Sequence, residues 1–264
     1  MLTTRYVTGS PNWLDLAAPD MEAAQRFYEG IFDWTFQSAG PEAGGYGMFQ
    51  SENRTVAGAM TVPPEQGPPS WTVYFQTPDA EATAKAVQAG GGSVAVEPMD
   101  VFDMGRMAVF TDPAGVGFAA WQPGTNKGLD VVNEDGALFW LELYAPDTDS
   151  ALTFYRSVFG WETTSLPMPG DAGNYLMINP SGQGADAMFG GIVPVDLDPA
   201  EAAEGPYWAP YFHVADVDAT VAKAEQLGGT VRMAPVDLEG VGRIAKLADP
   251  FGARFAIMKS SPTQ

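Results

Sequence analysis

The sequence predicts an α+β protein made of four βαβββ units, two in each half of the chain. The first observation is a repeat, in which residues 140–161 match residues 13–34 at eleven of 22 positions, at a constant offset of 127. The second is the alternation of short strand patterns with single amphipathic helices. The third is a linker rich in Gly, Asn and Asp at residues 123–136. We therefore expect one domain at residues 10–122 and another at residues 137–258.

The elements of the first copy follow from residue spacing. Leu14 and Leu16 share one face of an alternating strand pattern. Asp20 can cap a helix whose apolar residues keep helical spacing and which ends near Gly30. Short strands are expected next at about 34–37, 46–51 and 55–62. The order is therefore strand, helix and three strands.

A second unit begins at Trp71, where WTVYFQ alternates as a strand. A helix is expected at about 79–88, followed by strands at about 93–97, 105–111 and 117–121. The motifs TDPAG and ADPFG place Pro second and Gly fourth, which predicts hairpin turns. The second half repeats this order, because residues 98–121 match 235–258 at an offset of 137. The ten-residue change of offset falls in loops, chiefly within residues 179–191.

Composition excludes several classes of function. The chain has 264 residues with 33 acidic and 13 basic side chains, a formal net charge of −20. This charge repels nucleic acids and anionic membranes, so neither is an expected partner. No transmembrane-length apolar run and no signal-peptide pattern are visible, so we expect a cytoplasmic protein. The absence of cysteine excludes disulfides, thiolate metal sites and a Cys nucleophile.

The ordered motifs resemble those of the vicinal-oxygen-chelate superfamily, which includes glyoxalase I, bleomycin-resistance proteins and extradiol dioxygenases. The carriers are a strand followed by PD…FY…FDW or FGW, a strand followed by D…A..A…GG, and a closing GR…DPxG. The two-domain form is similar to actinobacterial proteins, some of them associated with aromatic polyketide biosynthesis. The resemblance implies two curved, cup-like eight-stranded sheets, with helices on the convex faces and ligands in the concave ones.

That family's chemistry depends on a divalent metal held by His, Gln or Glu. Carried over residue by residue, the resemblance places Trp13, Thr72 and Ala119 at the ligand positions of the first domain. The second domain has Trp140, Ala209 and Ala256 there. These side chains do not suit a divalent cation, apart from a weak contact by the Thr hydroxyl. We therefore expect no metal and no other cofactor.

Residues two apart on a strand share a face, so the resemblance also indicates which side chains line the cups. In the first cup they are Trp13, Asp15, Tyr74, Gln76 and Trp121, with Trp71 at the rim. In the second they are Trp140, Glu142, Tyr144, Tyr211, His213 and Met258, with Trp208 at the rim. Aromatic walls with one carboxylate suit a planar, largely apolar small molecule. Because Ala17 stands where the second cup has Tyr144, we expect the first cup to accept the bulkier guests.

An alternative interpretation of the same residues is a filled core, since Trp and Tyr are usually buried by packing. His213, the only histidine, could be structural, or it could act with Glu142 as an acid–base pair. Arg106 and Arg243 occupy equal places in the two halves, and pairing with nearby acids is the expected role of both.

Three hypotheses follow. The protein is a metal-independent binder in antibiotic sequestration or secondary-metabolite biosynthesis, a lyase, isomerase or hydroxylase-type enzyme using Glu142 and His213, or a structural or interaction protein with filled cups. The first hypothesis predicts binding without turnover, the second predicts loss of turnover in His213→Ala, and the third predicts that there is no cavity. The sequence leaves open a monomer or a homodimer.

Overall fold

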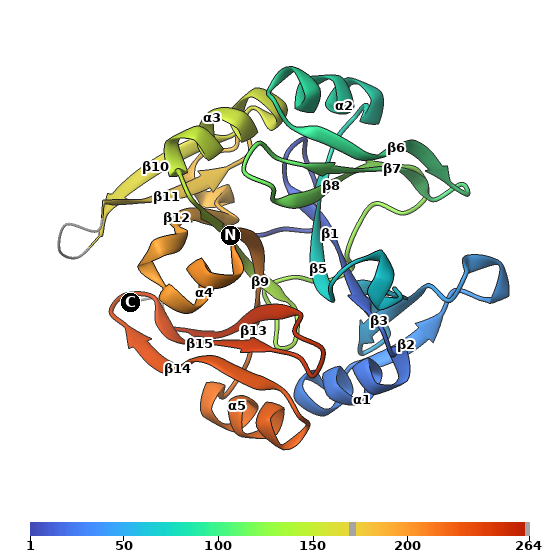
Figure 1. The fold of residues 1–264 in the computed structure, drawn as a ribbon, viewed down its shortest axis with the longest axis vertical. Helices are drawn as coiled ribbons and strands as arrows, with labels where there is room; N and C mark the ends of the chain where they lie inside the picture. Colours follow the sequence, from blue (N-terminus) through green and yellow to red (C-terminus); the bar gives the residue numbers. More distant parts are fainter. Residues whose placement is uncertain (169–172, 262–264) are drawn as a thin grey trace. The chain divides into compact units, whose positions relative to one another are not determined.

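The computed structural model describes residues 1–168 and 173–261 and confirms the predicted fold class. The first half contains α1 (Met21–Phe32) and α2 (Ala80–Ala89) (Figure 1). Its strands are β1 (Pro11–Ala18), β2 (Thr35–Ser38), β3 (Gly47–Ser51), β4 (Arg54–Thr61), β5 (Ser70–Gln76), β6 (Ser93–Val101), β7 (Gly105–Thr111) and β8 (Gly117–Pro123).

The second half repeats this order and adds one short helix. Its helices are α3 (Thr148–Phe159), α4 (Pro199–Glu204) and α5 (Val217–Gln226). Its strands are β9 (Leu138–Ala145), β10 (Glu162–Pro167), β11 (Asn174–Asn179), β12 (Gly190–Pro194), β13 (Tyr207–His213), β14 (Thr230–Leu238), β15 (Gly242–Ala248) and β16 (Arg254–Ser260). The extra residues of this half lie in the β11–β12 loop, where the change of offset placed most of them, and around α4, a helix that the sequence did not predict.

Each half contributes one mixed eight-stranded sheet, and the two have the same strand order. The first runs β2-β3-β4-β1-β5-β8-β7-β6 and the second β10-β11-β12-β9-β13-β16-β15-β14. The pairs β1–β4 and β5–β8 are parallel, as are β9–β12 and β13–β16. The outer pairs are antiparallel hairpins.

Short-range chemistry sets the ends of the elements. Asp20 and its three counterparts each cap a helix by accepting the backbone N–H three residues later, as an N-cap does. The two DPxG turns close as predicted, with Gly115 N–H donating to Asp112 O and Gly252 N–H to Asp249 O at 3.0 Å. β6 is longer than predicted, because two register shifts let it continue past Pro98.

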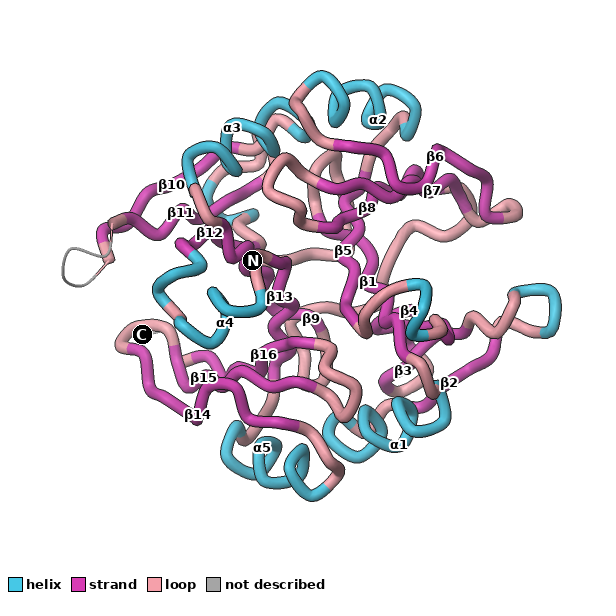
Figure 2. The backbone as a smooth tube through the Cα atoms, viewed as in Figure 1, coloured by secondary structure: helices cyan, strands magenta, loops and turns pink. Residues whose placement is uncertain are grey.

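The chain packs into two compact units that cut across the sequence repeat. The first unit combines 1–13, 72–128 and 141–208, and the second combines 14–71, 129–140 and 209–264. In the first unit α2 lies beside α3, and in the second α1 lies beside α5 (Figure 2). Helix α2 also covers β6 and β7, and α5 covers β14 and β15.

Each unit has an aromatic core built from both halves of the sequence. In the second unit the buried Tyr28 ring contacts Phe32, Trp34, Trp71 and Phe255. In the first unit the buried Tyr155 ring contacts the corresponding rings, which are Phe118, Trp161 and Trp208, and Phe159 packs on Trp161. The repeated FY…F.W stretch therefore encodes the core of each unit.

Candidate functional site

A carboxylate–tyrosine pair lies at β1 of the first sheet, in the part of that sheet that belongs to the second unit. Asp15 of β1 is half-buried, and its Oδ1 accepts a hydrogen bond from the Tyr46 hydroxyl at 2.7 Å. Asp15 stands opposite Gly58 of β4. A Cβ at Gly58 would collide with both the Tyr46 hydroxyl and the Asp15 carboxylate. The glycine therefore makes room for a tyrosine that crosses β4 to reach the acid.

The first unit contains the equivalent arrangement. Glu142 of β9 is buried and stands opposite Gly191 of β12. Tyr175 of β11 lies over Gly191, where a Cβ would collide with its ring and hydroxyl. Strand register proves the equivalence, because each tyrosine lies two residues before the methionine that faces the glycine. These pairs are Met48 with Gly58 and Met177 with Gly191.

The first unit carries two further tyrosines at this acid. The Tyr144 hydroxyl donates to Glu142 Oε2 at 2.9 Å. The Tyr144 ring also stacks on Tyr207, the first residue of β13, with centroids 5.2 Å apart and planes inclined by 11°. Tyr144 is buried and Tyr207 half-buried. The second unit has Ala17 and Ser70 at the corresponding positions of β1 and β5, so it has no such stack.

The two tryptophans expected at the cup rims lie in the aromatic cores. Trp71 Nε1 donates to the Tyr28 hydroxyl at 3.1 Å, and Trp208 Nε1 to the Tyr155 hydroxyl at 3.0 Å. These tyrosines in turn donate to Asp249 at 3.3 Å and to Asp112 at 3.2 Å. Each unit thus contains a buried Trp–Tyr–Asp chain of hydrogen bonds.

Burial governs the protonation of these chains. Desolvation raises the pKa of the Asp112 carboxyl, although backbone N–H groups and Tyr155 donate to it and oppose the rise. The pKa of Asp249 is raised for the same reason. Burial, together with the neighbouring carboxylate, also raises the pKa of Tyr28 and Tyr155 well above the ordinary value. Both tyrosines therefore stay neutral and act as hydrogen-bond donors to the aspartates.

His213 and Gln76 occupy equal places at the ends of β13 and β5 and bind different partners. His213 Nδ1 lies 2.7 Å from Oδ1 of the exposed Asp135, and its ring packs near Phe139 at 5.3 Å. Gln76 Nε2 donates to the Tyr6 carbonyl at 3.2 Å. Glu142 belongs to the first unit and His213 to the second.

The remaining predicted lining residues lie on the expected strands. Trp121 is buried on β8, and its Nε1 donates to the Asn126 carbonyl at 3.0 Å. Trp140 of β9 is half-buried. The others are buried on β1, β5, β13 and β16, namely Trp13, Tyr74, Tyr211 and Met258. The sequence did not indicate Tyr46, Tyr175 or Tyr207.

The residues at the family's metal positions do not fit a divalent cation. Ala119, Ala209 and Ala256 occupy three of the six positions and offer only methyl groups. Within residues 1–168 and 173–261, no group of three or more His, Asp or Glu side chains is placed to hold a metal ion.

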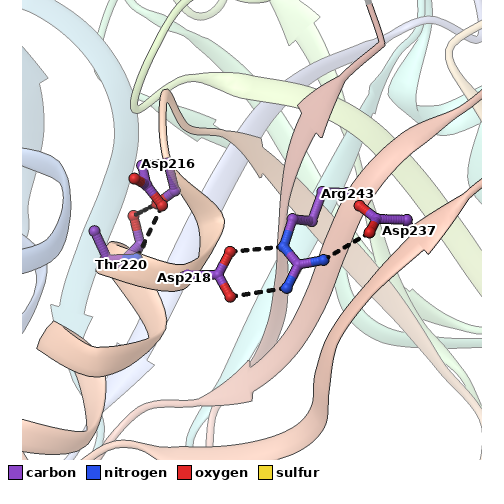
Figure 3. Close-up of polar contacts among 6 residues, drawn as sticks. Asp216, Asp218, Thr220, Asp237 and Arg243 are labelled. Carbon is purple, nitrogen blue, oxygen red and sulfur yellow. Dashed lines mark hydrogen bonds and ion pairs between the residues drawn. The ribbon is translucent and has the colours of Figure 1, made fainter.

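The two arginines at equal places in the two halves form ion pairs, as expected. Arg243 binds Asp218 of α5 through two hydrogen bonds of 2.6 and 2.8 Å and Asp237 of β14 at 3.0 Å (Figure 3). Arg106 has the equivalent partners Glu81 and Asp100. A cavity of about 550 Å³ borders Arg243 at the β14–β15 hairpin. Two carboxylates already bind this guanidinium.

No helix among the described residues is long and apolar enough to cross a membrane.

The chain is similar to two known bacterial proteins over nearly its whole length. It is 39% identical to "Anthracycline biosynthesis protein DauV" from Streptomyces sp. (strain C5), with 97% of this chain and 95% of that protein covered. It is 37% identical to "Putative glyoxylase CFP32" from Mycobacterium bovis, with 99% and 98% covered.

Solved structures share the fold at low sequence identity. The 2,3-dioxygenase LapB from Pseudomonas sp. KL28 matches with a TM-score of 0.65 and 15% identity over 97% of this chain and 94% of that one. The Mn(II)-bound glyoxalase from Novosphingobium aromaticivorans matches with 0.63 and 16%, over 96% and 82%. The family model "Glyoxalase/Bleomycin resistance protein/Dioxygenase superfamily" matches residues 10–119 and 137–257. The chain therefore belongs to the glyoxalase/bleomycin resistance protein/dioxygenase superfamily.

Proposed function

We propose that this protein binds a planar aromatic small molecule without a metal, in the biosynthesis or sequestration of a secondary metabolite. The observation that carries the proposal is a carboxylate hydrogen-bonded to a tyrosine in each unit, Asp15 with Tyr46 in one and Glu142 with the non-equivalent Tyr144 in the other. A few oriented polar groups among aromatic rings suit a flat ligand that stacks and is held by few hydrogen bonds.

The relatives support this ligand class. One of them is an anthracycline biosynthesis protein by name, and anthracyclines are planar fused-ring quinones that carry an amino sugar. A net charge of −20 favours a neutral or cationic guest over an anionic one. The side chains at the metal positions favour a binding role over the metal-dependent reactions of the wider family.

The expected affinity is micromolar. A ligand with about 25 to 30 non-hydrogen atoms at about 0.3 kcal/mol each reaches about 8 kcal/mol. A ligand stacked on an indole quenches its fluorescence, so titration with planar compounds should quench Trp13 or Trp140. We choose mitoxantrone, a cationic anthraquinone, and quinizarin, its neutral dihydroxy relative, as probes.

Trp13→Ala and Trp140→Ala test the proposal, with Trp13→Phe and Trp140→Phe as matched controls that keep an aromatic face. One alanine variant should weaken binding while its phenylalanine control retains most of it. The proposal fails if no planar compound binds below about 1 mM, which corresponds to about 4 kcal/mol. It also fails if both alanine variants bind as the wild type does.

A second candidate is an enzyme that uses Glu142 or His213. Two observations favour it: the buried Glu142 bonded to Tyr144, and the His213 imidazole held by Asp135 at 2.7 Å. A carboxylate bonded to an imidazole fixes its orientation, as general-base histidines require. Turnover of a bound compound by the wild type and its loss in His213→Ala, with binding retained, would establish this candidate. Absence of any bound compound would instead favour filled sheet faces and a structural role.

A further inference from the structure

The Asp15 and Glu142 sites differ on one side, next to the first residue of β5 and of β13 respectively. In the first unit Tyr144 and Tyr207 form a parallel stack beside Glu142. In the second unit the equivalent positions hold Ala17 and Ser70, both half-buried. The comparison is direct, because Ala17 and Tyr144 each lie two residues after the acid. Likewise, Ser70 and Tyr207 each begin their strand.

The stack occupies its site in the manner of a bound ligand. Its rings lie 5.2 Å apart and almost parallel, and one tyrosine hydroxyl donates to the carboxylate. A planar guest that stacks on aromatic walls and donates a hydrogen bond would make the same two interactions. Tyr144 is itself buried, so its ring takes up the space beside Glu142 that a guest would need.

The acid of the second unit is positioned for such a guest. The Tyr46 hydroxyl orients the Asp15 carboxylate at 2.7 Å, and it reaches the acid over Gly58, where a Cβ would collide with both groups. Two tyrosine side chains are replaced here by a methyl and a hydroxymethyl group. Even a cavity of about 150 Å³ lined by apolar groups binds benzene.

We infer that the chain binds one planar aromatic ligand with a hydrogen-bond-donating or cationic substituent at Asp15, and that the Tyr144–Tyr207 stack closes the equivalent site at Glu142. This inference rests on the proposed function and specifies its site, ligand class and stoichiometry. The two halves thus serve different purposes, with an open site in one unit and a self-filled site in the other.

Two complementary variants test the inference with mitoxantrone in equilibrium dialysis. The filled variant, Ala17→Tyr with Ser70→Tyr, copies the stack into the second unit. The opened variant, Tyr144→Ala with Tyr207→Ser, removes it from the first. The wild type should bind one equivalent, the filled variant should bind at least tenfold more weakly, and the opened variant should bind two equivalents. Circular dichroism melting verifies that each variant is folded.

The outcomes separate this inference from the proposed function. If the wild type binds no probe below about 1 mM, both fail. If the wild type binds two equivalents, or the folded filled variant binds as the wild type does, only the inference fails. An opened variant that still binds one equivalent also contradicts the inference. If the filled variant does not fold, the stoichiometry of the opened variant alone tests the inference. Quinizarin, which lacks the cationic side chains, should bind at the same site more weakly than mitoxantrone.

Discussion

Replacing Tyr155 with Phe removes one hydroxyl from the buried Trp–Tyr–Asp chain of the first unit. In the wild type Trp208 Nε1 lies 3.0 Å from the Tyr155 hydroxyl oxygen, and the change leaves this indole N–H without its acceptor. It also removes the donor that lies 3.2 Å from Asp112 Oδ2. A buried unsatisfied N–H costs about 1–3 kcal/mol, and a hydrogen bond to a charged group contributes about 1.5–3 kcal/mol. Ala114 and Val116 N–H still donate to the carboxylate, so we expect a loss of about 3 kcal/mol.

Urea denaturation followed by circular dichroism measures this loss in free energy of unfolding. For a chain of this size, the melting temperature should fall by about 6–12 °C. Tyr28→Phe makes the equivalent change in the second unit and should have a similar effect. The double variant Tyr155→Phe with Trp208→Phe should lose less than the sum of the single variants, because it removes the stranded donor. A loss below about 0.5 kcal/mol with no coupling to Trp208 would refute the reasoning.

The pH dependence of the same variant has a definite sign. The pKa of Asp112 is raised in the folded state. The contribution of Asp112 protonation to the free energy of unfolding is therefore complete below the pKa of the unfolded chain, about 3.9, and is lost as pH rises through the folded-state pKa. Removing the Tyr155 hydroxyl raises the folded pKa further, since that bond lowers it. The stability difference between wild type and Tyr155→Phe should therefore grow as pH increases over this range, and a difference that shrinks would contradict the assignment.

Three further predictions concern other parts of the fold. Gly58→Ala should cost about 1–3 kcal/mol by displacing Tyr46 from Asp15, whereas Gly117→Ala, where a Cβ meets open space, should stay within about 0.5 kcal/mol on urea denaturation. Trp161→Phe should lose about 1–3 kcal/mol in the same assay, because the buried carbonyl of Gly9 loses its 2.7 Å bond to the indole. Arg243→Gln should lower the melting temperature less than Trp161→Phe does, and that loss should disappear in 1 M NaCl, where exposed ion pairs are screened.

Features set by short-range chemistry were predictable from the sequence. The helix cap at Asp20, the DPxG hairpins and the order of strands and helices follow from turn residues and periodicity, and the structure confirms them. The ion pairs of Arg106 and Arg243 were also predictable, because each arginine has acids at matching positions of its own half.

Features that depend on long-range pairing were not predictable. Tyr155 of the second half bonds Asp112 of the first, and periodicity within one half carries no information about such a partner. The two rim tryptophans therefore looked like ligand contacts, although their indoles donate to core tyrosines. The equivalence of Tyr46 and Tyr175 was not predictable, because their sequence offset differs from the offset of the first strands. Only strand register relates these two tyrosines.

Isothermal titration calorimetry of EDTA-treated protein with mitoxantrone tests metal-independent aromatic binding most directly. We predict a dissociation constant in the micromolar range, unchanged when Mn²⁺ or Zn²⁺ is added after removal of the chelator. No binding heat below about 1 mM ligand, or binding that appears only when a divalent metal is restored, would contradict the account.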